Sequence, residues 1–364
     1  MSTQREAALR SAMETYADPY LGIDLASAGV IKSVKLDGDR AVVLLTLGFP
    51  AAKYGAELAA ALKARALGIE GIRQADIQVD WQVGSHAIKR NLKPIQGIRN
   101  IIVVASGKGG VGKSTTAANL ALALAHEGAV VGLLDADIYG PSQPQMMGLS
   151  GERPSTTDQR SMVAPVAYGV KVMSVGFLVD VDQPMIWRGP MVTQALVQLL
   201  ETTRWEDLDY LVVDMPPGTG DTQLTLSQRV PVSGAIIVTT PQDIALLDAR
   251  KGLRMFEKVE VPVLGIVENM STHVCSNCGH EEHIFGAGGG QRMAQQYGVA
   301  LLAELPLDIR IREQTDGGRP TVVAEPDSSL ARAYIDLARR ASASLARSSL
   351  EGGAAFPSIS VEDT

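Results

Sequence analysis

Two groups of residues in the sequence could do chemistry: a glycine-rich segment that contains lysines, and a pair of cysteines. The first group, residues 107–115, reads GKGGVGKST and follows an apolar run. The spacing of Gly107, Gly112, Lys113 and Ser114 fits the P-loop pattern, in which backbone N–H groups surround phosphates and a serine hydroxyl binds Mg²⁺. We therefore expect ATP or GTP here. The residues expected to contact it are Gly107, Lys108, Gly109, Gly110, Val111, Gly112, Lys113, Ser114 and Thr115.

The only two cysteines, Cys275 and Cys278, lie two residues apart in a polar segment. Two thiolates at this spacing can bind one edge of a metal site, but structural zinc and [4Fe–4S] clusters usually take four ligands. Within one chain, His280 and His283 could complete a zinc site. Across a dimer, the same two cysteines of a second chain would supply four thiolates, which suits an exposed iron–sulfur cluster. A redox-active dithiol is a further alternative.

Carboxylates and an amide follow three of the expected strands. Asp135 and Asp137 come after the first, Asp214 ends the second, and Asn269 follows the third. Ligands of open α/β sheets sit at the carboxyl ends of the strands, so we expect these side chains near the P-loop. Asp214 reads as a Walker B carboxylate that holds Mg²⁺ together with Ser114. Gly218 then provides the flexibility of a switch loop.

The order of apolar segments predicts an α/β fold with two domains. Strands that alternate with helices from residue 100 onward indicate a mostly parallel sheet covered by helices on both faces. Those strands are expected at 101–105, 130–134, 170–175, 210–213, 234–239, 263–267 and 301–304. Residues 1–83 are expected to form a small α+β domain, with helices at 5–16 and 51–67 and strands at 29–36, 40–47 and 72–79. Residues 84–99 are expected to be a linker, 100–347 the P-loop ATPase domain and 348–364 a disordered tail.

Composition excludes several classes of protein. The chain has 364 residues, 46% of them hydrophobic, which is typical of a globular protein. No apolar run approaches the ~20 residues of a membrane span, and the N-terminus lacks an apolar signal core. We therefore expect a cytoplasmic location and no membrane partner. A net charge of −7 argues against nucleic acid as the main partner, and two cysteines exclude a disulfide framework.

Residues Lys108 to Ser114 match K-G-G-x-G-K-[ST], so the loop resembles the deviant Walker A family. In that family the early lysine crosses a dimer interface to touch the partner's nucleotide. The resemblance therefore implies a nucleotide-dependent homodimer, with catalytic roles for Lys108 and Lys113. It also implies that Asp137 orients the attacking water, that Asp135 helps to arrange the Mg²⁺ shell, and that Asn269 reads the adenine.

Further motifs extend the resemblance to nearly the whole chain. These are DADIYGPS, DMPPGTGD, VENM before CSNCGH, and ELPLDIRIREQTDGGRP. Together with the P-loop they resemble the Mrp/ApbC family of iron–sulfur cluster carrier ATPases. The resemblance implies a slow, Mg²⁺-dependent, homodimeric ATPase that holds a transient [4Fe–4S] cluster between subunits at Cys275 and Cys278. The cluster would then pass to apo-proteins.

The N-terminal segment ADPYLGIDL resembles the small iron–sulfur assembly domain often fused ahead of such ATPases. In this chain Phe49 stands where that domain often has cysteine. We therefore expect an interaction or positioning module.

Three other functions share parts of this pattern. Partition and septum-positioning ATPases have the deviant P-loop but need a membrane or DNA surface. The expected C-terminal helix, 328–347, presents Ala and Leu without Trp or Phe, which is typical of a packing helix. A nitrogenase-reductase-like protein would carry a cysteine near the Walker B strand, where this chain has PPGTGD. A zinc-stabilised dimeric ATPase adaptor remains an alternative.

Overall fold

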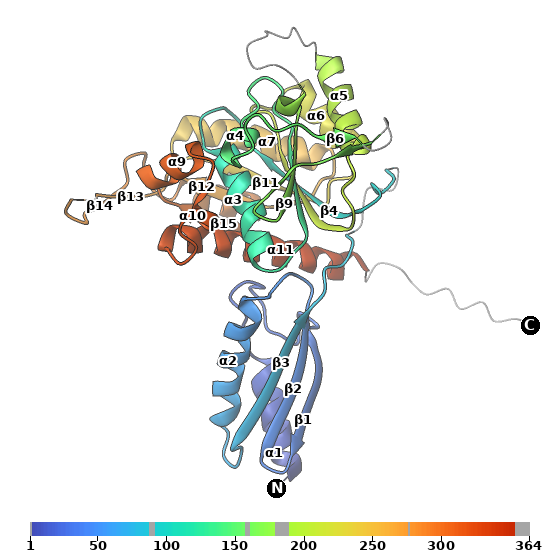
Figure 1. Ribbon diagram of the computed structural model, residues 1–364. Helices are drawn as coiled ribbons and strands as arrows, with labels where there is room; N and C mark the ends of the chain where they lie inside the picture. Colours follow the sequence, from blue (N-terminus) through green and yellow to red (C-terminus); the bar gives the residue numbers. More distant parts are fainter. Residues whose placement is uncertain (1, 87–91, 157–160, 179–188, 276, 354–364) are drawn as a thin grey trace, which may run out of the picture. The chain divides into compact units, whose positions relative to one another are not determined.

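The computed structural model describes residues 2–86, 92–156, 161–178, 189–275 and 277–353 (Figure 1). The chain divides into two compact units: residues up to 87 together with those from Ser342 onward, and residues 88–341. The expected domain boundaries at 83, 99 and 347 stay a prediction. None of the helices in the described part of the chain is long and apolar enough to cross a membrane.

The first unit is a small α+β fold, as expected. Its elements are α1 (Ser2–Glu14), β1 (Ile31–Asp37), β2 (Arg40–Leu47), α2 (Tyr54–Leu67) and β3 (Gln74–Trp81). The sheet has the order β1-β2-β3, with β1 antiparallel and β3 parallel to β2. Alternate residues of β2 are buried, so one face of the sheet packs against the helices.

The residues of this unit that resemble an iron–sulfur assembly domain serve packing. Asp18 is buried, and its carboxylate accepts hydrogen bonds from the backbone N–H groups of Tyr20 and Leu21, both at 2.9 Å, and from the Tyr54 hydroxyl. Phe49 is fully buried and stacks on Tyr54 with ring centroids 6.3 Å apart. The aromatic side chain at position 49 therefore contributes to the core of this unit.

The second unit is built on an eight-stranded sheet in the order β15-β12-β11-β4-β10-β5-β9-β8. All neighbouring strands are parallel except β8, which is antiparallel to β9. The seven strands expected from the sequence are confirmed. They are β4 (Ile98–Ala105), β5 (Val131–Asp135), β9 (Val170–Ser174), β10 (Leu208–Asp214), β11 (Gly234–Thr239), β12 (Val263–Asn269) and β15 (Leu301–Leu305).

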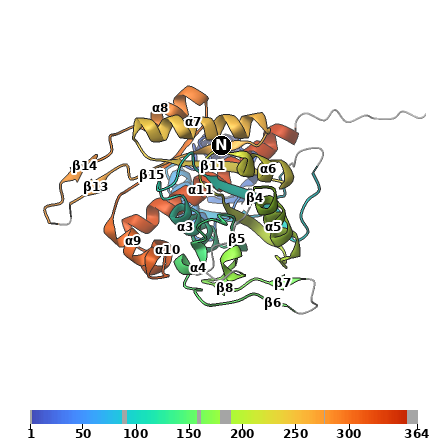
Figure 2. The same ribbon diagram turned by 90° about the horizontal axis from the view of Figure 1, so that it is seen from above.

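Helices cover both faces of this sheet, which confirms the expected fold class. Figure 2 shows α7 (Asp243–Lys258) and α8 (Gly289–Tyr297) on one side and α3 (Lys113–His126) on the other. The strands of the centre are buried along their whole length, as a sheet covered on both faces requires. The remaining helices are α4 (Gln143–Met146), a 3₁₀ turn (Val175–Phe177), α5 (Gly189–Thr202), α6 (Asp221–Arg229), α9 (Ile309–Asp316), α10 (Thr321–Ala324) and α11 (Ser329–Gly353).

Three short strand pairs and the last helix complete the chain. The hairpins are β6 (Ser155–Thr156) with β7 (Met162–Val163), and β13 (His273–Val274) with β14 (Glu281–Glu282), while β8 (Val166–Ala167) pairs with β9. Helix α11 continues to Gly353, into the segment expected as a disordered tail. The rest of that segment lies outside the described residues.

A buried ion pair joins the end of the P-loop helix to α11. Glu127 follows α3, and Arg339 lies on α11; both side chains are 1% exposed. The Nε and Nη2 atoms of Arg339 donate to Glu127 Oε1 at 2.8 and 2.6 Å. Charges removed from water in this way are stabilised only while both partners are present.

We expect Glu127→Leu or Arg339→Met alone to lower the free energy of unfolding by roughly 3–5 kcal/mol, since each removes the oppositely charged partner of a buried charge. The double replacement should recover most of this loss. Urea unfolding followed by circular dichroism measures both effects. Arg312→Ala is the control, because that side chain is 62% exposed and should contribute less than about 1 kcal/mol. A double variant no more stable than either single variant would contradict the assignment.

Candidate nucleotide and metal site

The glycine-rich loop joins β4 to α3 at the carboxyl end of the central strands. Two of its glycines cannot be replaced without strain, Gly107 because of close backbone packing and Gly112 chiefly because of its left-handed φ of +80°. A Cβ on Gly107 would lie 2.2 Å from the backbone of α7, and one on Gly112 would lie 2.1 Å from the amide of Asn269. By contrast, a Cβ on Gly110 would meet nothing within 4 Å, and one on Gly109 only a side chain 4.0 Å away. The open side of the loop, where a phosphate could approach, is therefore at Gly109 and Gly110.

Lys113 and Asp214 form a buried ion pair inside this loop. Their side chains are 6% and 0% exposed, and Nζ of Lys113 contacts Asp214 Oδ1. The same Nζ lies 3.2 Å from the hydroxyl oxygen of Ser114. Lys113 thus neutralises the carboxylate expected to hold Mg²⁺, so a bound nucleotide must compete with Asp214 for this ammonium group.

Asp135 is held by the loop that follows it. It ends β5 and pairs in register with Asp214 on β10. Burial, and then repulsion from Asp214, raise the pKa of Asp135 to about 7, while hydrogen bonds from the loop oppose this rise. Its two oxygens accept from Asp137 N (3.1 Å), Ser142 N (3.0 Å), Gln143 N (3.1 Å) and Ser174 Oγ (3.1 Å). The main visible role of Asp135 is therefore to anchor the loop that carries Asp137.

The remaining expected switch residues lie around the same pair. Asp137 is half-buried; burial raises the pKa of its carboxyl group, the charge of Lys113 lowers it, and that of Asp214 raises it. Gly218 has a φ of +103°, and its N–H donates to Ser106 O at 3.0 Å, next to the P-loop. Lys108 is half-buried and makes no ion pair with any residue in the described part of the chain.

Gln143 is a residue of this site that the sequence analysis did not identify. It is fully buried, and its Nε2 donates to Asp214 Oδ2 at 2.9 Å and to Ser114 O at 3.0 Å. The sequence holds a second glutamine two positions later, Gln145, which is exposed. Nothing in the segment QPQ shows which of the two turns inward.

Asn269 contacts the P-loop in this structure. It ends β12, and its Nδ2 donates to the carbonyl oxygen of Val111 at 2.9 Å. Its expected role in reading adenine stays a prediction. Thr115, also expected at the site, is half-buried in the first turn of α3.

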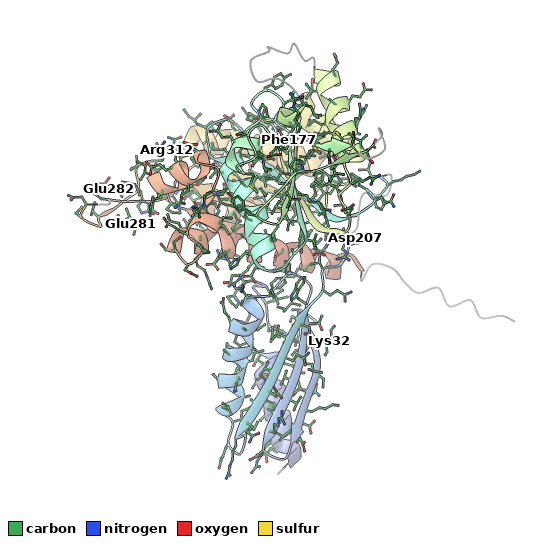
Figure 3. All side chains as sticks on the ribbon, in the orientation of Figure 1. Lys32, Phe177, Asp207, Glu281, Glu282 and Arg312 are labelled. Carbon is green, nitrogen blue, oxygen red and sulfur yellow. The ribbon has the colours of Figure 1, made fainter. Side chains whose placement is uncertain are left out.

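The two cysteines lie at the turn between β13 and β14, a hairpin that extends away from the body of its unit (Figure 1). Cys275 is half-exposed and Cys278 exposed, and both thiols are free. Figure 3 shows the labelled Glu281 and Glu282 on the same extended segment. The turn is closed by bonds from Cys275 N to His280 O and from Gly279 N to Cys275 O, both 2.9 Å. The thiols are therefore accessible to a second molecule.

Two histidines attach the base of this hairpin to the segments that follow β12 and β15. The Nδ1 atoms of His273 and His283 lie 3.0 Å from Leu307 O and 2.9 Å from Ser271 O. A carbonyl oxygen can only accept, so each Nδ1 carries the proton. Among the described residues no group of three or more His, Cys, Asp or Glu side chains is placed to hold a metal ion. A zinc site within one chain, with His280 and His283 as ligands, is therefore not preformed.

The residues of the loop fit a Mg²⁺–nucleotide. Ser114, Asp214 and Gln143 bring together hydroxyl, carboxylate and amide oxygens, the hard ligands that Mg²⁺ and its bound waters prefer. Gln143 Oε1 is buried and has no hydrogen-bond partner among the described residues. Lys113 could supply positive charge to bound phosphates, and Mg²⁺ would neutralise the remaining negative charge of the phosphates and of Asp214.

We expect Lys113→Met to lower nucleotide affinity roughly 100-fold, because the phosphates lose a charge-assisted contact. It should also destabilise the nucleotide-free protein, since buried Asp214 loses its ion-pair partner. Asp214→Asn in the same chain should restore part of that stability. Calorimetric titration with ADP and urea unfolding measure the two effects. Lys251→Met, at an exposed position on α7, is the control, and an unchanged ADP affinity in Lys113→Met would overturn the assignment.

The hairpin predicts a second measurable property. Hydrogen bonds from the N–H groups of Asn277 and Cys278, and then from the Cys278 thiol, lower the pKa of Cys275. In a metal-free Cys278→Ser chain, the rate of Cys275 alkylation by iodoacetamide should therefore rise with pH at a lower midpoint than in the same chain unfolded in urea. These donors stabilise the thiolate only in the folded turn. A folded midpoint equal to or above the unfolded one would contradict this.

Comparison with known proteins covers both units. A family model described as ParA, the NUBPL iron-transfer P-loop NTPase, matches residues 97–342, and one for an iron–sulfur cluster assembly protein matches residues 6–79. The chain is 50% identical over 339 residues to the iron–sulfur cluster carrier protein of Escherichia coli K12, covering 93% of this chain and 92% of that protein. It is 56% identical over 248 residues to the mouse iron–sulfur cluster transfer protein NUBPL, covering 68% and 77%.

Solved structures agree with the fold. A nucleotide-binding protein of Archaeoglobus fulgidus in complex with ADP is 37% identical and superposes with a TM-score of 0.57, covering 65% of this chain and 92% of that one. The cell division ATPase MinD of Pyrococcus furiosus is 25% identical, with a TM-score of 0.50 and coverage of 66% and 97%. With these matches, the expected family resemblance is confirmed: the chain belongs to the NUBPL family of iron-transfer P-loop NTPases.

Proposed function

We propose that this chain is an ATP-hydrolysing iron–sulfur cluster carrier that works as a cytoplasmic homodimer. It holds a transient [4Fe–4S] cluster between two subunits and transfers it to apo-proteins. The observation that carries this proposal is the position of the two cysteines. They lie on an exposed hairpin that begins directly after β12, the strand whose last residue, Asn269, holds the P-loop.

The P-loop supports the nucleotide part of the proposal. Lys113 would turn from Asp214 to the phosphates, and Ser114 and Asp214 would hold Mg²⁺, which would supply charge neutralisation at the phosphates. Asp137 orients the attacking water. The side-chain amide of Asn269 releases its hydrogen bond to Val111 O and binds the adenine instead. Hydrolysis is slow, because a switch needs long-lived nucleotide states.

The cluster is cargo, and one chain cannot supply its ligands alone. Cys275 and Cys278 provide two thiolates, whereas a [4Fe–4S] cluster takes four. A two-fold axis beside the hairpin brings two identical pairs together. Lys108, without an ion pair among the described residues, is available to touch the partner's nucleotide across the same axis.

The alternatives are less well supported. The relatives with 50% and 56% identity are named as a cluster carrier and a cluster transfer protein, whereas the MinD likeness is 25% identical over the fold. A zinc site completed within one chain would need further ligands near the cysteines, and the described residues form no group of three or more His, Cys, Asp or Glu placed to hold a metal. These observations favour the carrier.

Anaerobic reconstitution with iron and sulfide tests the proposal. The unaltered chain should bind about four iron atoms per two chains, with the optical spectrum of a [4Fe–4S] cluster, and should sediment as a dimer. Cys275→Ser and Cys278→Ser should each lose the cluster and the cluster-dependent dimer. Asn277→Ser, in the same turn, is the matched control and should keep both. A Cys275→Ser chain that still binds a normal cluster would exclude the bridging arrangement.

A further inference from the structure

We propose that Gln143 is a positioning residue for Mg²⁺: it holds the Walker B carboxylate Asp214 in place and offers Oε1 to a water of the hydrated ion. This inference rests on the proposed Mg²⁺–ATP site and adds a residue to it. Gln143 is the first residue of α4, in the loop that begins at Asp135.

The side-chain amide of Gln143 has a defined orientation. Its nitrogen lies between two acceptors, Asp214 Oδ2 at 2.9 Å and Ser114 O at 3.0 Å. A carboxylate and a carbonyl oxygen can only accept, so a flipped amide would place its oxygen against both. The nitrogen therefore faces Asp214 and Ser114, and both of its protons are used.

The amide oxygen of Gln143 is then left without a donor. Oε1 is buried and has no hydrogen-bond partner among the described residues. A buried acceptor without a donor costs about 1–3 kcal/mol, so its retention beside the phosphate loop needs a reason. Mg²⁺ keeps several of its waters when it binds to proteins, and such waters are strong donors. A hydrated Mg²⁺ at Ser114 and Asp214 would provide the missing donor.

The contact with Asp214 gives Gln143 a second effect. Lys113 binds Oδ1 of Asp214, and Gln143 binds Oδ2. When Lys113 turns to the phosphates, the neutral amide still orients the carboxylate without competing with Mg²⁺ for charge. The backbone N–H of Gln143 also donates to Asp135 Oδ2 at 3.1 Å, which ties the Asp137 loop to the same point. Gln143 contacts no nucleotide in this scheme and acts through Asp214 and through water.

The test separates Mg²⁺ binding from nucleotide binding. ADP affinity is measured calorimetrically in EDTA and at increasing Mg²⁺, and Mn²⁺ binding to the ADP complex is followed by electron paramagnetic resonance. For Gln143→Met, which keeps the side-chain length but loses the amide, we expect affinity in EDTA within about twofold of the unaltered chain. The Mg²⁺ and Mn²⁺ concentrations for half-saturation should rise about tenfold or more, since a hydrogen bond to a charged group is lost.

Two further variants keep the test decisive. Gln145→Leu, at the exposed glutamine of the same helix, should leave both measurements unchanged. Gln143→Asn retains an amide on a side chain one carbon shorter. It should also raise the Mg²⁺ and Mn²⁺ concentrations for half-saturation, and it replaces the Met variant in the test if that variant does not fold. Unchanged Mg²⁺ dependence in folded Gln143 variants would overturn the inference. An equal loss of affinity in EDTA and in Mg²⁺ would also overturn it, because that marks a purely structural role. If the unaltered chain shows no Mg²⁺-dependent ADP binding, the proposed function itself fails.

Discussion

The buried ion pair between Lys113 and Asp214 is the interaction on which the nucleotide site depends. Asp135 and Asp214 lie in register on neighbouring strands, and both are fully buried. Repulsion between buried carboxylates raises carboxyl pKa values and destabilises the fold unless a cation lies close by. Lys113 is that cation, and its ion pair with Asp214 therefore links the P-loop to the end of β10.

The end of β12 connects this site to the cysteine hairpin. Asn269 holds the P-loop, Met270 adopts a left-handed φ of +58°, and Ser271 accepts the hydrogen bond of His283. A non-glycine residue in that conformation stores strain, which persists only where its surroundings enforce it. Here the two neighbours of Met270 are fixed by the nucleotide loop and by the hairpin. Contacts of this kind can carry energetic coupling between two sites.

Much of the fold follows from local pattern, whereas the partners within the site do not. The seven apolar runs could be predicted as strands because the strands of a sheet covered on both faces carry apolar side chains on both faces. The P-loop could be predicted from the spacing of its glycines and lysine. Gln143 could not be found in this way. Its amide contacts Asp214, 71 residues away in sequence, and only the register of β5 beside β10 brings the two together. For the same reason the hydrogen bond from Asn269 to the carbonyl oxygen of Val111, 158 residues away, could not be predicted from the sequence.

The sequence by itself determined the chemistry that is available: a P-loop, acidic strand ends and one pair of thiols, since each depends on residue types at short spacing. It also determined the class of fold, because hydrophobic period and turn residues act locally. Only the tertiary structure decided which oxygen each donor reaches. It placed Lys113 on Asp214, turned Gln143 inward and Gln145 outward, and directed His273 and His283 to backbone carbonyls. These contacts depend on strand order and burial, because a buried polar group forms its hydrogen bonds with the groups that tertiary packing places next to it.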